Sequence, residues 1–204
     1  MSLQIVSLPT VYLARHGETE WSPIGRHTGR IDLPLTQNGE QEARTLEPRL
    51  RKISFAQVFT GPLQRAYRTC ELAGFGATCI VDPDLVEWDY GEYEGKTTPE
   101  ILENRPNWRL AFDGCPGGES AEQVGVRVDR IVARARSIAK STKSNVLLFS
   151  SGHTLRVLAA RWLGLNPEAG IFFSLMKTAS LSALGYEANL DQPTIQLWND
   201  RCHL

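Results

Sequence analysis

Five residues suited to phosphate chemistry stand in segments that follow predicted strands. They are Arg15 and His16 after residues 11–14, Arg65 and Arg68 after residues 55–59, and His153 after residues 146–149. Guanidinium groups pair bidentately with phosphate oxygens, and an imidazole adds a donor or a nucleophile. Any one of these residues alone is as readily explained as a hydrogen-bonded loop residue, but together they indicate a phosphate site.

Strand and helix patterns alternate along the chain and would position these residues. Short apolar or β-branched runs predict strands at residues 11–14, 55–59, 79–81, 146–149, 181–184 and 194–198. Helix signals predict one helix that starts after Thr36, one at residues 63–72, and one that starts after Thr98 with Pro99 as its first residue. They also predict a helix that starts at the capping box of Ser120 and Gln123, and one at residues 154–163 that stops before Gly164. Pro48 is expected to kink or shorten the first of these helices.

This order of elements predicts an α/β fold, a three-layer sandwich with a mostly parallel central sheet and helices on both faces. Functional loops are then expected at the carboxyl ends of the strands. Residues 1–204 are expected to form a single domain, because one domain takes about 100 to 200 residues. Residues 82–118 are rich in glycine, proline and aromatic residues and predict a long irregular excursion that forms a binding wall.

Composition narrows the function classes. Lys+Arg 22 against Asp+Glu 23 leaves no basic excess, so nucleic acid is not expected as a partner. No apolar run has the length of a membrane span, and residues 1–4 lack the features of a signal peptide, so a cytoplasmic protein with reduced thiols and no membrane partner is expected. Neither CxxC nor HExxH occurs, so no metal is predicted.

Several motifs resemble those of the histidine phosphatase superfamily, the phosphoglycerate-mutase-like proteins. The matching segments are residues 13–21 with the RHGxT signature, 32–39, 60–66, 87–95, 117–120 and 152–153, in the family's order. The other branch, acid phosphatases and phytases, carries RHGxRxP and a late His-Asp pair, whereas this chain has Thr19, Trp21 and Thr154 at those places. Within the mutase-like branch, the chain is most similar to sugar-bisphosphate phosphatases of the sedoheptulose-1,7-bisphosphatase type.

The resemblance implies a mechanism without cofactor or metal. Neutral His16 would attack phosphorus and form a phosphohistidine, while Arg15, Arg65 and protonated His153 would hold the phosphate oxygens. Glu87 would protonate the leaving oxygen and then activate water. That role requires a raised pKa, for which the neighbouring aromatic residues could provide a desolvating wall.

Further contacts are expected from residues near these motifs. The candidates for phosphate or substrate binding are Ser22, where the family often has Asn, Thr28, Gly29, Thr154 at a helix start, and Trp21 and Tyr90 in the two variable walls. For Thr154 an ordinary helix cap is an equally good interpretation.

The resemblance implies a metal-independent phosphomonoesterase acting on a small phosphorylated substrate, a sugar phosphate or bisphosphate of the sedoheptulose-1,7- or fructose-1,6-bisphosphate type. The alternatives are a phosphoglycerate mutase, a protein phosphatase, or a non-catalytic phosphate-binding adaptor. A mutase must shield its phosphohistidine from water, and the chain has little room for the extra wall segment of the mutases, which favours hydrolysis. A homo-oligomer is permitted by the predicted C-terminal strands.

The remaining polar residues are expected to have no catalytic role. His27 is adjacent to the proposed site, where it could touch a substrate, but a solvated loop residue is the favoured interpretation. His203 is interpreted as part of a disordered tail, and Arg68 as the partner of a carboxylate. Four arginines of the long helix are expected to form a solvated face, namely Arg127, Arg130, Arg134 and Arg136.

Overall fold

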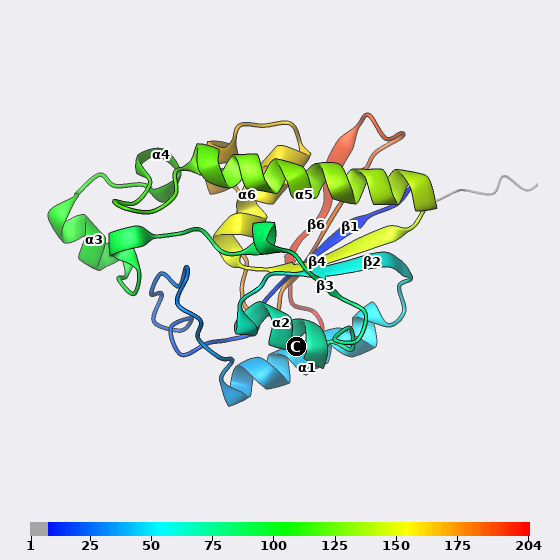
Figure 1. Cartoon of the computed structure of the whole chain (residues 1–204), viewed down its shortest axis with the longest axis horizontal. Helices are drawn as coiled ribbons and strands as arrows, with labels where there is room; N and C mark the ends of the chain where they lie inside the picture. The colour runs from blue at the N-terminus through cyan, green and yellow to red at the C-terminus, as the bar shows by residue number, and fades with distance from the viewer. Residues whose placement is uncertain (1–7) are drawn as a thin grey trace, which may run out of the picture.

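Six strands form one mixed sheet in the computed structural model, which describes residues 8–204 (Figure 1). They are β1 (Val11–Arg15), β2 (Phe55–Thr60), β3 (Ile80–Val81), β4 (Asn145–Ser150), β5 (Leu181–Tyr186) and β6 (Pro193–Asp200). Their order across the sheet is β3-β2-β4-β1-β5-β6; the β1–β5 and β5–β6 pairs are antiparallel, and the other three pairs are parallel. The predicted α/β class with a mostly parallel sheet is confirmed. The prediction that residues 1–4 lack the features of a signal peptide concerns residues outside the described range.

Helices cover both faces of the sheet. They are α1 (Gln37–Leu50), α2 (Gln64–Leu72), α3 (Thr98–Asn104), α4 (Leu110–Asp113), α5 (Ala121–Thr142) and α6 (Gly152–Trp162). Figure 1 shows α1 and α2 on one side of the sheet, α5 and α6 on the other, and α3 and α4 extending beyond one end of the molecule. Within residues 8–204, no helix is both long and apolar enough to cross a bilayer.

Alternating side chains of the central strands pack into two hydrophobic cores, one on each face of the sheet. Leu13 and Leu148 are buried in the cluster toward α5 and α6, whereas Ala14 and Phe149 belong to the cluster toward α1 and α2. The period of two in strand side chains produces this division. β4 is therefore buried on both faces, which explains its uninterrupted apolar sequence.

Local signals set most helix starts. The Thr36 hydroxyl accepts a hydrogen bond from the Gly39 N–H at 3.0 Å, and Ser120 and Gln123 form the predicted capping box of α5. Pro48 lies inside α1, which ends two residues later. The cap of α3 is Thr97 rather than Thr98, because a glutamate three residues after Thr97 completes a capping box with it.

Two helix and loop boundaries differ from expectation in ways that affect the site. α6 begins at Gly152, not at residue 154, so His153 lies in its first turn. The excursion at residues 82–118 holds α3, α4 and the 3-10 helices Pro83–Leu85 and Gly91–Tyr93, which is more regular structure than the sequence indicated.

The sheet register brings the two predicted histidine loops together. Arg15, the last residue of β1, is paired with Ser150, the last residue of β4. The N–H of His16 donates to the carbonyl oxygen of Ser150 at 3.0 Å. The loops that carry His16 and His153 therefore leave the sheet side by side.

Candidate active site

His16 is held as a neutral imidazole with one free nitrogen. Its Nδ1 lies 2.7 Å from the carbonyl oxygen of Gly17, which can only accept, so Nδ1 carries the hydrogen and Nε2 keeps its lone pair. Burial and the nearby charges of Arg65 and Arg15 lower the pKa of His16 well below its usual value. Gly17 is required because a Cβ there would lie 2.3 Å from the carbonyl oxygen of Gly39.

Arg15 and Arg65 place two guanidinium groups around this nucleophile. The Nε atoms of both are enclosed and have no hydrogen-bond partner among residues 8–204. An enclosed donor without a partner is costly, so these groups suit an anionic ligand. Arg65 also fixes the neighbouring loop: its guanidinium donates over 2.8–2.9 Å to the carbonyl oxygens of Thr28, Gly29 and Ile31.

Glu87 lies at the amino end of α6, with its carboxylate surrounded by donors. The N–H groups of His153 and Thr154 lie 3.1 and 2.9 Å from its two oxygens, and the N–H of Trp88 lies at 2.8 Å. Burial alone would raise the pKa of Glu87, but His153 and these three N–H groups outweigh it and the pKa lies below its usual value. The expected raised pKa is therefore wrong for the ligand-free site, because the backbone donors stabilise the carboxylate.

His153 is also neutral in the ligand-free site, contrary to the expected imidazolium. Burial lowers its pKa to about 3, although the charge of Glu87 acts in the opposite direction. Its Nδ1 lies 2.7 Å from the hydroxyl of Tyr90 and 4.0 Å from a carboxylate oxygen of Glu87. With the Tyr90 hydroxyl donating to Nδ1, the His153 ring carries its hydrogen on Nε2.

A buried ion pair between Arg127 and Glu119 lies next to the segment that carries Glu87, and the sequence did not predict it. Arg127 was expected on a solvated face, but it is only 7% exposed. Its guanidinium donates to Glu119 at 2.9 and 3.1 Å, to the carbonyl oxygen of Val86 at 2.8 Å and to the Thr154 hydroxyl at 3.3 Å. Arg127 therefore ties the residue before Glu87 to the helix turn that binds the Glu87 carboxylate.

Four of the five predicted catalytic residues line one cavity of about 500 Å³. Its wall includes Arg15, His16, Ser22, Ile24, Arg26, His27, Thr28, Glu87, Tyr90, Thr97, Thr98, His153 and Leu175. Of the predicted residues, His16, Glu87, His153 and Arg15 face this cavity together with Ser22, Thr28 and Tyr90. Arg65 lies behind the wall, fully enclosed.

The remaining predicted binding residues have other positions. Thr154 is fully buried, and its N–H and hydroxyl contact Glu87, so it positions the carboxylate instead of facing a ligand. Gly29 lies beside the cavity, where a Cβ would be 2.5 Å from the carbonyl oxygen of Trp88. Trp21 does not line the cavity; its ring lies under the guanidinium of Arg26, 6.0 Å away, and against Gly95.

His27 is part of the site, against the expectation of a solvated loop residue. Its ring is mostly buried and lies 4.7 Å from the ring of Tyr90 and 6.0 Å from the ring of His153, measured between centroids. Its Nε2 is 3.3 Å from the hydroxyl of Thr98. The sequence signal for this position was the place of His27 in the loop after Arg15 and His16, next to the predicted contacts Thr28 and Gly29.

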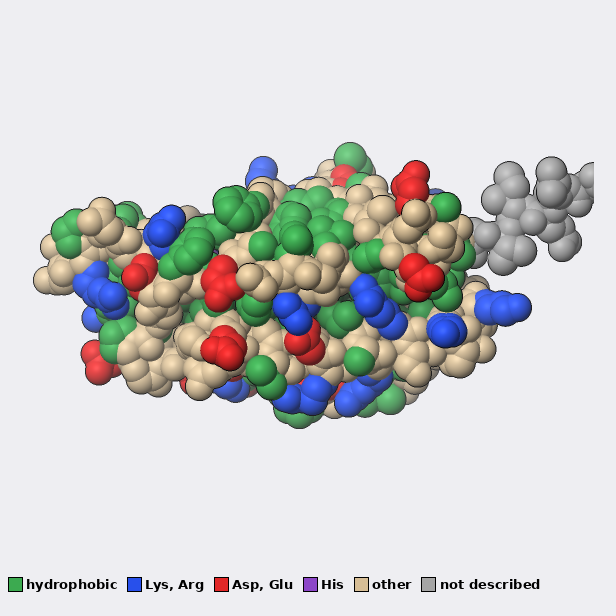
Figure 2. Space-filling model, turned by 90° about the horizontal axis from the view of Figure 1, so that it is seen from above, with side chains coloured by type: hydrophobic (Ala, Val, Ile, Leu, Met, Phe, Trp, Pro, Cys, Tyr) green, Lys and Arg blue, Asp and Glu red, His purple; other side chains and the backbone are tan. Residues whose placement is uncertain are grey.

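Other residues outside the cavity show mixed outcomes. Arg68 pairs with Glu40 at 3.0 Å, as predicted. His203 is ordered rather than part of a disordered tail, since its Nε2 lies 2.8 Å from the carbonyl oxygen of Ala179. Arg130 pairs with Asp84, and Arg134 pairs with Asp82. Figure 2 shows basic and acidic side chains interspersed on the upper face of the molecule. Arg136 lies over the ring of Trp162.

The chemistry available here is nucleophilic attack at phosphorus. A neutral imidazole nitrogen, the guanidinium of Arg15 and a carboxylate that can exchange a proton meet at one cavity, and Arg65 lies directly behind its wall. Residues 8–204 contain no cluster of three His, Cys, Asp or Glu side chains placed to hold a metal ion, and all four cysteines are free thiols.

Comparisons with known proteins agree with this arrangement. Residues 11–201 match the model of the histidine phosphatase superfamily (branch 1). The chain is 40% identical to an acid phosphatase of Mycobacterium tuberculosis, over 88% of each protein. It is 38% identical to the sedoheptulose 1,7-bisphosphatase of Saccharomyces cerevisiae, over 78% of this chain and 69% of that protein. A solved structure of an M. tuberculosis open reading frame product superposes with a TM-score of 0.86 and 37% identity, covering 94% of this chain and 97% of the other.

Proposed function

The chain belongs to the histidine phosphatase superfamily and is a phosphoric monoester hydrolase, and we propose that its substrate is a small sugar phosphate or bisphosphate cleaved through a phosphohistidine. The observation that carries the mechanism is the neutral His16, whose Nε2 lone pair is available in the cavity that Glu87 and His153 also line. Phosphates of the sedoheptulose-1,7- or fructose-1,6-bisphosphate type are the favoured substrates.

In the first step, His16 Nε2 forms a bond to phosphorus while the bond to the ester oxygen breaks. Arg15 and Arg65 compensate the charge on the phosphoryl oxygens, and His153 donates from Nε2. The leaving oxygen takes a proton from Glu87. In the second step, Glu87 removes a proton from water, whose oxygen attacks phosphorus and releases phosphate and neutral His16.

The low pKa of Glu87 in the ligand-free site is compatible with this role. A phosphate dianion beside Glu87 is a like charge, and like charges raise the pKa of a carboxyl group. The substrate itself then promotes protonation of Glu87, just before the proton is needed. The same dianion favours protonation of His153, which would strengthen its hydrogen bond to the phosphoryl group.

Polar walls support a hydroxylated substrate. The cavity carries the hydroxyl groups of Ser22, Thr28 and Thr98 and the ring of His27, all suited to sugar hydroxyls. Arg26 adds a guanidinium to the same wall, which suits a second phosphate group. The similarity to a sedoheptulose 1,7-bisphosphatase supports the same substrate class.

The test is phosphate release in EDTA from sedoheptulose-1,7-bisphosphate, fructose-1,6-bisphosphate, 3-phosphoglycerate and a phosphotyrosine peptide. We expect the sugar bisphosphates to be preferred, and the His16→Ala variant to lose phosphate release and the phosphoenzyme that is trapped by rapid quenching. His203→Ala is the matched control, because His203 lies outside the cavity.

Three outcomes would contradict the proposal. Phosphate release that persists in His16→Ala would show that His16 is not the nucleophile. Preference for the phosphotyrosine peptide would identify a protein phosphatase. Phosphate transfer between positions of 3-phosphoglycerate with little release of free phosphate would identify a mutase.

A further inference from the structure

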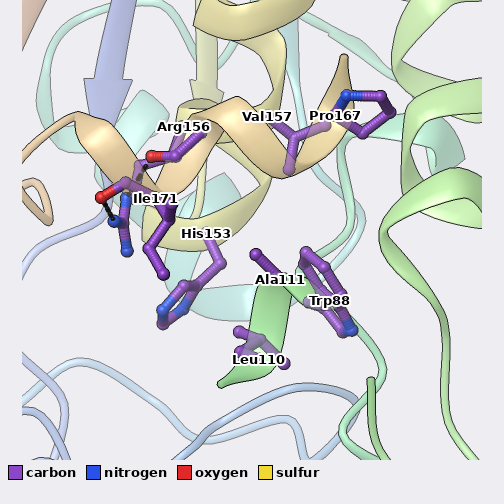
Figure 3. A pocket seen from close by; sticks show the side chains of 9 residues that line it. Trp88, Leu110, Ala111, His153, Arg156, Val157, Pro167 and Ile171 are labelled. Carbon is purple, nitrogen blue, oxygen red and sulfur yellow. Dashed lines mark hydrogen bonds between the residues drawn. The ribbon is translucent and has the colours of Figure 1, made fainter. Parts of the chain in front are cut away.

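A second, apolar cavity of about 80 Å³ adjoins the catalytic cavity, and we call it the apolar annex (Figure 3). It lies between α6, α4 and the 3-10 helix Pro167–Phe172. Its carbon surfaces come from Trp88, Leu110, Ala111, Val157, Pro167 and Ile171. Neither the reaction described above nor any of the predicted contacts uses this space.

The polar groups that border the annex already have partners in the protein. Arg156 donates to the carbonyl oxygens of Gly170 at 2.9 Å and Ile171 at 2.8 Å, as the dashed lines of Figure 3 show. The indole N–H of Trp88 donates to a backbone oxygen of Glu119 at 2.9 Å. The annex therefore offers a ligand mainly carbon surface, and such cavities favour apolar groups over water.

His153 connects the annex to the reaction. It is the one residue that lines both cavities, and its Nδ1 is engaged by Tyr90. In the proposed reaction the ester oxygen takes its proton from Glu87, whose carboxylate lies 4.0 Å from Nδ1 of His153. His153 and Trp88, the residue after Glu87, both line the annex, so the annex lies next to the group that would protonate the leaving oxygen (Figure 3).

We propose that the apolar annex is a leaving-group subsite, which extends the substrates to phosphomonoesters with a short alkyl portion. This proposal rests on the proposed phosphomonoesterase function. An apolar cavity of about 150 Å³ binds benzene, which has six carbons, so the annex at about 80 Å³ holds about three non-hydrogen atoms. Sugar phosphates would use the polar wall at His27 and Thr98, and apolar esters would use the annex.

The direct test measures binding without catalysis. Ethyl-, butyl-, hexyl- and octylphosphonate are titrated by calorimetry in the presence of EDTA. Burial of one methylene contributes about 0.8 kcal/mol, so the dissociation constant should fall about fourfold per carbon up to about four carbons and then level off. Butylphosphonate should bind more tightly than 3-hydroxypropylphosphonate, which has the same number of chain atoms but carries a polar end.

Two variants link this gain to the annex. Ala111→Phe fills the annex with a larger side chain. This variant should bind ethylphosphonate as the wild type does, but its affinity should no longer rise as the alkyl chain lengthens. Ala188→Phe makes the same change at an exposed position outside both cavities and should keep the gain. Val157→Thr keeps the volume and adds a hydroxyl, so it provides a milder test of polarity should Ala111→Phe fold poorly.

A flat dependence on chain length in the wild type, or an unchanged gain in both annex variants, would overturn the proposal. Hydrolysis of the corresponding alkyl phosphates is measured in parallel, and these share nearly the same leaving-group basicity. If alkyl phosphates are hydrolysed but phosphonate affinity does not rise with chain length, the subsite proposal is rejected and the proposed function is kept. If affinity rises with chain length but no ester is hydrolysed, sugar phosphates included, the proposed function is rejected and the annex remains a binding site.

Discussion

The hydroxyl of Tyr90 lies 2.7 Å from Nδ1 of His153, so a residue of the cavity wall contacts a residue that is proposed to hold phosphate. Burial and the nearby charge of Glu87 raise the pKa of Tyr90 well above its usual value, which keeps the phenol protonated. When this phenol donates to Nδ1, the bond selects the neutral His153 tautomer with its hydrogen on Nε2.

Tyr90→Phe removes the hydroxyl that selects the His153 tautomer and keeps the aromatic ring. Loss of one neutral hydrogen bond is worth about 1 kcal/mol, so we expect kcat to fall about fivefold with little change in KM. Tyr93→Phe is the matched control, because its hydroxyl contacts Arg105 instead of His153. An unchanged kcat in Tyr90→Phe, or an equal loss in both variants, would show that the bond has no part in the reaction.

Arg127→Lys should lower kcat about tenfold without a comparable change in KM. Lysine keeps the charge beside Glu119 but cannot reach the Val86 carbonyl and the Thr154 hydroxyl together. Arg127→Met leaves Glu119 unpaired, and breaking a buried pair costs about 3–5 kcal/mol, so its free energy of unfolding should drop by that amount. Steady-state kinetics and urea unfolding measure these effects.

Arg130→Lys is the control for this experiment, since Arg130 pairs with Asp84 at the surface of the same helix. Its kinetics and stability should match the wild type. If Arg127→Lys also matched the wild type, Arg127 would be a purely structural residue of α5.

Gly29→Ala should weaken substrate binding. The added Cβ would lie 2.5 Å from the Trp88 carbonyl oxygen, so the loop must shift, and the Gly29 carbonyl that holds Arg65 shifts with it. Overpacking of this kind costs about 1–3 kcal/mol. We expect KM to rise about tenfold, measured against Gly164→Asn outside both cavities, where a Cβ meets nothing within 4 Å and asparagine tolerates the φ of +75°.

Stability should fall as the pH falls below about 6.5, the usual pKa of an unfolded histidine. The pKa of His153 is lowered to about 3 and that of His16 is also lowered, so between these values the unfolded chain binds protons that the folded chain excludes. Each such histidine contributes a slope of up to about 1.4 kcal/mol per pH unit. Urea unfolding at pH 8, 7, 6 and 5 measures the slope.

His153→Gln should flatten this slope between pH 6 and 5 and leave the difference between pH 8 and 7 unchanged. A variant slope equal to that of the wild type would show that His153 is protonated in the folded protein.

The sequence was most informative where a signal is local. Strand periodicity, the Thr36 cap and the Ser120 capping box depend on neighbouring residues, so the fold class and most helix starts could be predicted. The positions of Arg15, His16 and His153 followed from strand ends that share one edge of a parallel sheet.

Predictions failed where a residue's environment comes from distant parts of the chain. Arg127 looks like its neighbours on a charged helix, and only contacts with residues 84–86 and Thr154 make it a buried residue. His27 is enclosed by the excursion at residues 82–118, whose path the sequence did not define. The donors around Glu87 come from α6, so the sign of its pKa shift required the structure.

The central place of β1 has a consequence for how the protein is made. β1 is synthesised well before its two sheet neighbours, β4 and β5, which are residues 145–150 and 181–186. Long-range pairing of this kind delays folding, because the entropy of closing the intervening loop must be lost before the paired strands stabilise the fold. A nascent chain thus carries His16 through the synthesis of at least residues 17–186 before the site exists, and during that time the exposed β1 is a segment for chaperones to shield.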